Sequence, residues 1–134
     1  AAMKFVEDST HSTTNSTTWG NYKDNAWTID RPTASYTISS SAIGWMTISS
    51  SKNKTSSKGI LLTTGASDSF KAKNIFDLAG NVSELTMEAN GSSRRVRRGG
   101  EYDSTGSVGP ASYRTSVNAA GYGVSLGFRP ALYL

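Results

Sequence analysis

Few residues in this chain of 134 could carry catalysis. There is no cysteine, which excludes disulfides, thiolate metal sites and cysteine nucleophiles. The single histidine, His11, lies in a run of serine and threonine, and no motif places a carboxylate or a serine nucleophile around it. No phosphate-binding loop, metal-ligand spacing or nucleophile elbow occurs either. The sequence therefore predicts a solvated His11 and a protein without catalysis.

Four arginines surround Val96, at positions 94, 95, 97 and 98. On a strand, Arg95 and Arg97 would point to one face, and Arg94, Val96 and Arg98 to the other. One interpretation is a phosphate-binding stripe of the kind used for nucleic acid. The other is structural, with Val96 in the core and the arginines bonding loop carbonyls or carboxylates. The net charge is only +4, and we expect the structural role and no nucleic-acid partner.

Three sequence motifs follow one another in the last part of the chain: GNVSELT (80–86), RVRRGG (95–100) and GFRPALYL (127–134). They resemble the C-terminal half of the formylglycine-generating-enzyme (sulfatase-modifying factor) family, a branch of the C-type lectin fold. The usual consensus of these motifs in the family is Gly-Asn-Val-Trp-Glu-Trp, then Arg-Val-x-Arg-Gly-Gly, then Gly-Phe-Arg. The resemblance covers residues 74–134 strongly and 1–73 weakly.

The resemblance implies one C-type-lectin-like α+β domain over residues 1–134, trimmed at its N-terminus, with irregular loops, small antiparallel sheets and few helices. In the enzymes of this family, paired cysteines between the second and third motifs hold the catalytic metal. Their absence here argues against an oxidase of sulfatase cysteines and implies a scaffold used for binding. The family has an arginine at the positions of Arg98 and Arg129 whatever the member does, which supports a structural role for both.

Proteins related in fold to this family bind calcium near the first motif. They do so through asparagine, carboxylate and backbone oxygens, which are the ligands that calcium prefers. The corresponding residues here are Asn81 and Glu84. Both tryptophans of the family motif are replaced, by Ser83 and Leu85. We therefore expect Asn81 to shape a turn and Glu84 to pair with an arginine, and we expect no cofactor.

The amino-acid composition changes between the second and third motifs. The 24 residues 102–125 contain no Lys, Glu, Met or Trp, whereas residues 1–101 contain 17 of these four types. At that frequency about four would be expected in a stretch of this length. All residue types present there can be encoded by codons that end in a pyrimidine, and mutation of adenines in Asn-type codons leaves this pattern. The alternative is an ordinary loop region rich in glycine and serine.

This layout resembles the variable proteins of diversity-generating retroelements, in which error-prone reverse transcription rewrites a ligand-binding face. The variable region would span about 99–134. The resemblance implies a constant frame of Arg98-Gly99-Gly100, Pro110-Ala111-Ser112, Arg114 and Gly127-Phe128-Arg129. It implies that the displayed residues lie among Tyr102, Asp103, Ser107, Val108, Tyr113, Thr115, Ser116, Val117, Asn118, Gly121, Tyr122 and Val124.

Tyrosines among small polar residues are also the composition of antibody binding sites, with Tyr102, Tyr113 and Tyr122 as the expected anchors. The resemblance implies a protein or glycan partner on another cell or a phage host. It also implies a location on a bacterial surface, in secretions or on a phage virion. A carbohydrate-binding or adhesin domain of fixed specificity is the alternative. No apolar run approaches the ~20 residues that span a bilayer.

Hydrophobic spacing predicts the elements that must position these residues. We expect a helix end at 1–8, loose strands within 35–51, a charged loop at 52–58 and a short strand at 60–64. Strands at 82–88 and 94–98 should form a hairpin around Asn90-Gly91, and an edge segment should follow at 127–134. Trp19, Tyr22 and Trp27 should be buried anchors. The remaining predicted core residues are Phe76, Leu78, Val82, Val96 and Phe128.

Overall fold

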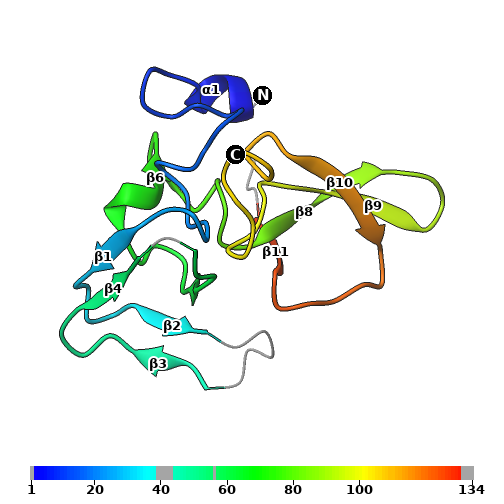
Figure 1. Ribbon diagram of the computed structural model, residues 1–134. Coiled ribbons are helices and arrows are strands. Elements are labelled where there is room, and N and C mark those ends of the chain that lie inside the picture. The colour runs from blue at the N-terminus through cyan, green and yellow to red at the C-terminus, as the bar shows by residue number, and fades with distance from the viewer. Residues whose placement is uncertain (1, 39–43, 56, 131–134) are drawn as a thin grey trace.

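The computed structural model describes residues 2–38, 44–55 and 57–130, and these ranges contain short strands and little helix (Figure 1). The elements in chain order are α1 (Ala2–Val6), β1 (Trp27–Ile29), β2 (Ser35–Thr37), β3 (Met46–Thr47), β4 (Lys52–Lys54), β5 (Leu61–Leu62), the 3-10 turn η1 (Asp68–Phe70), β6 (Lys71–Ala72), β7 (Ile75–Phe76), β8 (Ser83–Ala89), β9 (Arg94–Arg98), β10 (Arg114–Asn118) and β11 (Leu126–Phe128).

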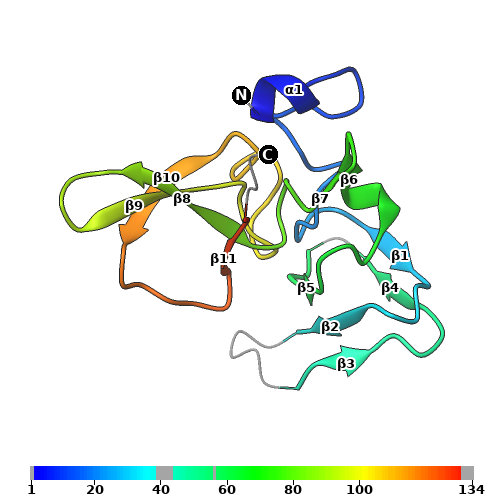
Figure 2. The same ribbon diagram turned by 180° about the vertical axis from the view of Figure 1, so that it is seen from behind.

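The strands of the described ranges form small sheets, with orders β1-β4, β3-β2-β5, β6-β7 and β10-β9-β8-β11. Every pair is antiparallel except β11 with β8. Strands β1 to β5 lie on one side of the molecule, the four-stranded sheet lies on the other, and α1 lies at one end (Figures 1 and 2). The expected small antiparallel sheets and scarcity of helices are therefore confirmed.

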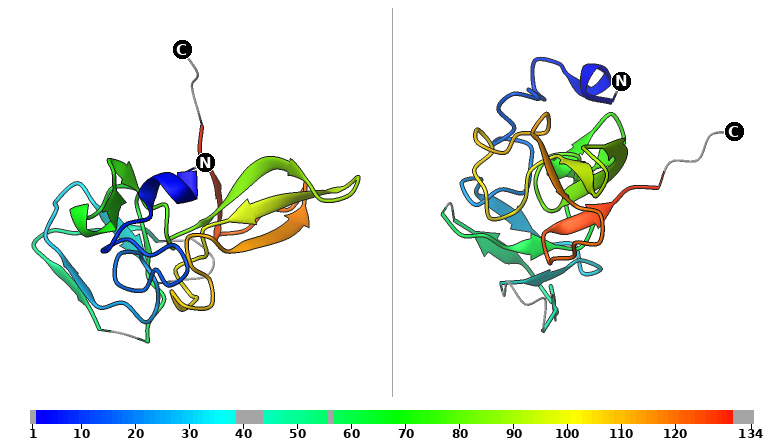
Figure 3. Two further views of the ribbon diagram at one scale, coloured as in Figure 1. Left: turned by 90° about the horizontal axis from the view of Figure 1, so that it is seen from above. Right: turned by 90° about the vertical axis from the view of Figure 1, so that its right-hand side faces the viewer.

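The hairpin predicted around Asn90-Gly91 is present as β8 and β9. Gly91 has a φ of 78°, in the left-handed region that glycine adopts without steric cost, and the amide of Asn90 donates to Arg94 O at 3.0 Å. The register shifts between Leu85 and Ala89, so that β8 carries a bulge or similar irregularity. The hairpin and β10 project away from the rest of the protein (Figure 3).

Two clusters of buried side chains form the core. The first lies around β1, β5 and η1, and its members are Trp27, Ile29, Ala34, Ile48, Ile60, Leu62, Ala66 and Phe70. The second joins α1 to β6 and to the segments that precede β1, β8 and β10, and its members are Val6, Trp19, Tyr22, Ala72, Leu78, Ala79 and Ala111. The predicted anchors Trp19, Tyr22 and Trp27 are all buried, and Val6 is the buried residue of the expected helix.

Two buried asparagines connect segments that are distant in the sequence. The Asn81 side chain accepts from Leu62 N at 3.0 Å and donates to Leu62 O at 3.0 Å. Its Oδ1 also accepts from Asn21 Nδ2, which in turn donates to Ile60 O at 2.8 Å. Asn21 Oδ1 accepts from the Trp27 indole. The expected turn at Gly80-Asn81 is real, with φ values of 70° and 62°, and it places the Asn81 amide in the interior.

The core prediction is correct for Leu78 and Val96, which are buried, and is wrong for Phe128, which is 78% exposed. Phe76 and Val82 are half-buried. Phe128 lies in β11, and β8 is the strand that pairs with it. The final strand therefore lies at an edge of the sheet, as the nearby Pro130 suggested, and the Phe128 ring remains in solvent.

The segment 52–58 was expected to be a loop, but its first three residues form β4 and pair with β1. Lys54 is buried because its ammonium donates to Tyr22 O at 2.6 Å and to Lys23 O at 3.3 Å. The expectations for 35–51 and 127–134 fall partly on residues 39–43 and 131–134, which lie outside the described residues. Within the described part, β2, β3 and β11 agree with them.

Candidate functional site

The candidate binding segment begins at Gly99-Gly100, directly after β9. Both glycines have left-handed φ values, 94° and 68°, and a Cβ on Gly100 would lie 1.9 Å from Gly109 O. The chain therefore turns sharply here, and the two ends of the loop 100–109 approach each other at a distance that only glycine permits. The amide of Gly80 donates to Gly99 O at 2.7 Å, which joins this turn to the Gly80-Asn81 turn.

The loop that follows is attached to the N-terminal part of the chain through its backbone. Ser16 N donates to Gly106 O, Lys23 N donates to Ser104 O, and Ser112 N donates to Thr13 O, each at 3.0 Å. A Cβ on Gly106 would lie 2.3 Å from Thr17 Cα, so the two backbones are in direct contact. Because these bonds use main-chain groups of the loop, they hold it in place independently of most of its side chains.

The twelve residues expected on a displayed surface differ in exposure. Five are exposed: Asp103, Ser107, Val108, Asn118 and Tyr122. Six are half-buried: Tyr113, Thr115, Ser116, Val117, Gly121 and Val124. Tyr122 and Val108 are 98% and 73% exposed, which is unusual for side chains of this size.

Tyr102 differs from the other candidates because it is buried, with 7% of its surface exposed. Its backbone amide donates to Asn81 O at 3.0 Å, and burial raises the pKa of its phenol. We expected it to be a ligand-contacting anchor. In the structure its surroundings are those of a packing residue, and the two other tyrosines remain accessible.

Strand β10 places its candidates on both faces of the sheet. Thr115 pairs with Arg97 and Val117 with Arg95, whereas Ser116 pairs with Val96. Paired residues share a face in an antiparallel sheet, so Thr115 and Val117 lie on the face opposite to Ser116. The strand therefore does not present all its candidates to one ligand surface.

The structure brings several candidates together at the end of β10. The amide of Gly121 donates to Asn118 O at 2.8 Å, and a Cβ on Gly121 would lie 3.1 Å from Val117 Cγ2. Asp103, by contrast, packs near Gly59, where a Cβ would lie 2.7 Å from its Oδ1. The candidates thus form one group at the β10 end and another on the loop after β9.

The arginines near the site mostly have protein partners. Glu88 bonds Arg114 at 2.5 Å and Arg98 at 3.2 Å, and these bonds, that with Arg114 first, lower the pKa of the Glu88 carboxyl. Arg97 pairs with Glu101 at 3.5 Å. Arg94 donates through Nε to Ser116 Oγ at 2.9 Å. This arrangement is the structural one, in which carboxylates and hydroxyls occupy the guanidinium groups.

Arg129 and Glu84 form an ion pair, and Arg129 also donates to Phe76 O at 2.9 Å. Sequence reasoning placed Glu84 and Asn81 together as candidate calcium ligands. The Asn81 amide bonds to the backbone of Leu62 and to the side chain of Asn21 in the interior, and Glu84 pairs with Arg129 as expected. Among the described residues, no group of three or more His, Cys, Asp or Glu side chains could hold a metal ion.

Sequence reasoning missed Asp77, a buried carboxyl in the same region. Its Oδ2 accepts from Gly65 N at 2.8 Å, while its buried Oδ1 has no hydrogen-bond partner among the residues that the structure describes. Burial raises the pKa of this carboxyl to about 6. Its φ of 53° is left-handed, which Asp tolerates better than most residues, and this conformation is not visible in the sequence.

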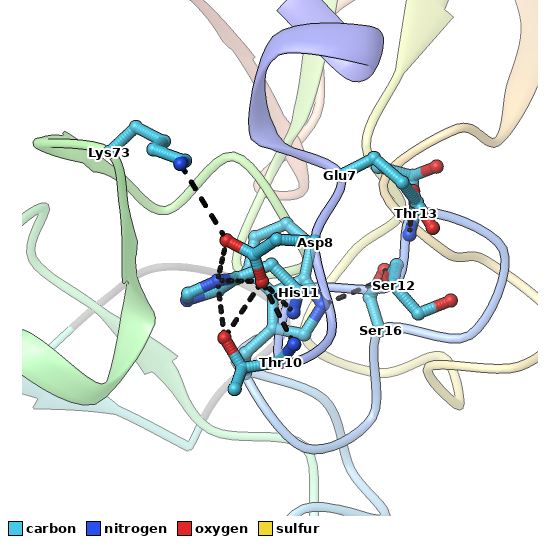
Figure 4. Close-up of polar contacts among 9 residues, drawn as sticks. Glu7, Asp8, Thr10, His11, Ser12, Thr13, Ser16 and Lys73 are labelled. Carbon is cyan, nitrogen blue, oxygen red and sulfur yellow. Dashed lines mark hydrogen bonds and ion pairs between the residues drawn. The ribbon is translucent and has the colours of Figure 1, made fainter.

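His11, the only histidine, is half-buried rather than solvated. Its Nδ1 lies 2.9 Å from Asp8 Oδ1 (Figure 4), and its ring packs edge-on against Trp19 at a centroid distance of 5.3 Å. Asp8 also accepts from the amide and hydroxyl of Thr10, and these bonds hold the pKa of its carboxyl well below the usual range. His11 therefore belongs to a local turn that follows α1, and the contacts around it are those of a structural residue.

Comparison of the chain with protein-family models, with curated proteins and with solved structures finds no match. No helix in the described ranges has the length and apolar character needed to cross a membrane.

Proposed function

We propose that this chain is a non-catalytic ligand-recognition domain with a C-type-lectin-like fold of the formylglycine-generating-enzyme type. In this proposal, a diversified surface within residues 99–134 binds the ligand, as in the variable proteins of diversity-generating retroelements. The partner would be a protein or glycan on another cell or phage host. The proposal assigns no cofactor and no catalysis, because the chemistry of the enzyme family uses cysteines and this chain has none.

The observation that carries the proposal is the way in which the segment 99–121 is held. Main-chain bonds join it to residues 13, 16, 23, 80, 81 and 93, and the β9–β10 ladder holds residues 114–118. Backbone bonds of this kind persist when side chains are exchanged, so the segment can accept many sequences in one conformation. The residues that such a segment requires are the glycines at its close approaches. Gly99 and Gly100 belong to the expected constant frame and Gly109 adjoins it, whereas Gly106 lies outside the frame and Gly121 is one of the twelve expected displayed residues.

The composition of residues 102–125 supports the same proposal, since every type present can be reached by mutation of Asn-type codons. The five exposed candidates are the positions at which variation would reach a ligand. Tyr122 and Val108 would contribute most of the apolar contact area, while Ser107 and Asn118 would add hydrogen bonds. We now assign Tyr102 to the frame because of its burial.

A pair of combinatorial libraries would test this function. The first randomises the five exposed candidates, and the second randomises five exposed positions elsewhere, at Thr14, Asn15, Thr33, Ser49 and Ser50. Both libraries should remain folded, because exposed positions usually change stability by less than ~0.5 kcal/mol. Selection against one test protein, such as lysozyme, should yield binders from the first library at a much higher frequency.

Equal yields from the two libraries would refute a specialised binding surface. A third library, randomised at buried positions, serves as the control for unfolding; these positions are Ile29, Leu62, Phe70, Leu78 and Val96. If the first library unfolds as often as the third, the candidates are structural. The retroelement itself has a separate test in the gene neighbourhood. A reverse transcriptase gene beside a near-copy of the codons for 99–134, with adenines at the candidate codons, is expected there.

A further inference from the structure

A hollow on the surface beside β4 contains an unusual number of lysines. It has a volume of about 480 Å³, within the range of small-molecule sites, and is lined by Ile38, Lys52, Asn53, Lys54, Thr55, Lys58, Gly59 and Ile60. Three of these eight residues are lysines, and none is acidic. All lie outside the composition-biased segment 102–125, so the hollow belongs to the constant part of the protein.

Lys54 gives the hollow a fixed positive charge. The residue is only 4% exposed, and its ammonium donates to the carbonyls of Tyr22 and Lys23, with the nitrogen 5.7 Å from the Trp27 ring centroid. An ammonium has three N–H donors, so these two carbonyls leave one for a further acceptor. Burial lowers the pKa of Lys54 to about 8, because desolvation disfavours the charged ammonium, and the negative charge of Asp24 opposes this shift only in part.

The two other lysines are placed at the rim. The Lys52 ammonium lies 4.5 Å above the centre of the Tyr36 ring, which restricts a side chain that is otherwise flexible. Lys58 is exposed, and the amide of Lys58 donates to Lys23 O at 3.2 Å. Within the described ranges, none of the three lysines forms an ion pair, whereas Lys71 and Lys73 each have an aspartate.

Asp103 lies at the edge of this hollow. A Cβ on Gly59 would be 2.7 Å from Asp103 Oδ1 and 3.2 Å from Asp103 Cα, so the aspartate packs directly against a lining residue. Asp103 is exposed and forms no ion pair with any described residue. Its negative charge would oppose an anion that approaches the lysines.

We propose that this hollow binds the sulfate or carboxylate group of an acidic saccharide, and that Asp103 lowers the affinity. The lysines supply charge-assisted hydrogen bonds to the oxyanion, with Lys54 fixed at the inner end. Asn53 and Thr55 offer an amide and a hydroxyl for sugar hydroxyls, and Ile38, which is 66% exposed, offers apolar surface for the C–H groups of the ring. The anion site does not depend on the diversified surface; only the exchange of Asp103 during diversification rests on the proposed function.

The test measures binding of a sulfated heparin disaccharide by NMR titration of the intact chain, with its unsulfated counterpart as the neutral probe. Shift changes should map to Lys52, Lys58 and Gly59 for the sulfated sugar and be weak for the neutral one. Lys52→Gln and Lys58→Gln should each weaken binding about two- to fivefold, the effect of removing one exposed ion pair. Lys4→Gln, the same charge change on exposed α1, should leave the affinity unchanged.

Asp103→Asn should change the affinity in the opposite direction, with about two- to fivefold tighter binding. This sign separates a local site from a general response to net charge, because Asp68→Asn, at an exposed aspartate elsewhere, should have little effect. An equal loss of affinity in Lys4→Gln and Lys58→Gln would overturn the proposal. So would equal binding of the neutral disaccharide. Tighter binding of tetraglutamate than of the sulfated sugar would overturn the saccharide as ligand.

Discussion

Replacement of Asn81 by alanine should be among the most destabilising single changes in this protein. The side chain satisfies both backbone polar groups of Leu62 and one amide hydrogen of Asn21, all in the interior. Alanine would leave the Leu62 amide and carbonyl without these partners, and each unsatisfied buried group costs about 1–3 kcal/mol. The loss of two such groups gives a destabilisation of about 2–6 kcal/mol, a large part of the total stability of a domain, which is about 5–15 kcal/mol.

Asn81 also has a left-handed backbone, with a φ of 62°, which alanine tolerates poorly. Asn74→Ala is the matched control, because Asn74 has a φ of 66° but is exposed and belongs to the tight turn between β6 and β7. This control should show only the backbone cost, on the order of 1 kcal/mol. The difference between the two variants then measures the buried hydrogen bonds alone.

Urea unfolding followed by tryptophan fluorescence provides the assay, since Trp19 and Trp27 are buried and the Trp27 indole donates to Asn21 of this network. The midpoint should fall strongly for Asn81→Ala and slightly for Asn74→Ala, with the same slope for both if unfolding remains two-state. Equal midpoints for the two variants would refute the argument that the asparagine amide holds the two halves of the fold together. Calcium should not restore the stability of Asn81→Ala. If Asn81 were a calcium ligand, the stability of the wild type would depend on calcium.

Further outcomes follow from the same structure. Asp77 has a folded pKa of about 6, above its ordinary value of 3.8, so its contribution is fully present below pH 4 and is lost as the pH rises through 6. Asp77→Asn should therefore gain stability relative to the wild type as the pH rises from about 4 to about 6.5, by up to about 3 kcal/mol, and the difference should level off above that; a constant difference across this pH range in thermal melts would contradict it. Arg129→Ala should lower the melting temperature more than Arg98→Ala, because Arg129 bonds a backbone carbonyl as well as a carboxylate, whereas the bond of Arg98 within the described residues is to a carboxylate; equal losses would contradict this. A chelator should shift the melting temperature little, and a large drop that calcium alone restores would revive the site at Asn81 and Glu84. Incubation with a cysteine-containing sulfatase peptide and copper should yield no formylglycine above a control without protein, since thiolate donors are missing.

The parts of the fold that the sequence predicts best are those with local signals. The β8–β9 hairpin follows from alternating apolar residues and the Asn90-Gly91 turn, and Val96 follows from its position between arginines. The large aromatic residues near the N-terminus were correctly expected to be buried, since few other side chains in that stretch could form a core.

The errors concern residues whose burial depends on long-range contacts. Phe128 and Tyr102 have similar hydrophobic surfaces, and the first is exposed while the second is buried. The Tyr102 amide bonds to the carbonyl of the buried Asn81, so that Tyr102 lies against the interior, whereas Phe128 lies in β11 at a sheet edge. No local pattern contains this information. The same holds for Lys54, whose buried ammonium is explained by two carbonyls about thirty residues away in the sequence.

The burial of Tyr102 sharpens the proposed function. A segment that accepts many sequences still needs some invariant positions to hold its path, and buried residues are the ones that substitution would disturb most. In the loop after β9, these positions are the close-approach glycines 99, 100 and 106, together with Tyr102 and Ala111. Asp103, Ser107 and Val108 alternate with them and remain in solvent. A diversified surface on this scaffold should therefore vary at the second set and stay constant at the first. Sequencing of variants from one population would reveal that pattern position by position, and frequent exchange of Tyr102 or Gly106 without loss of folding would contradict it.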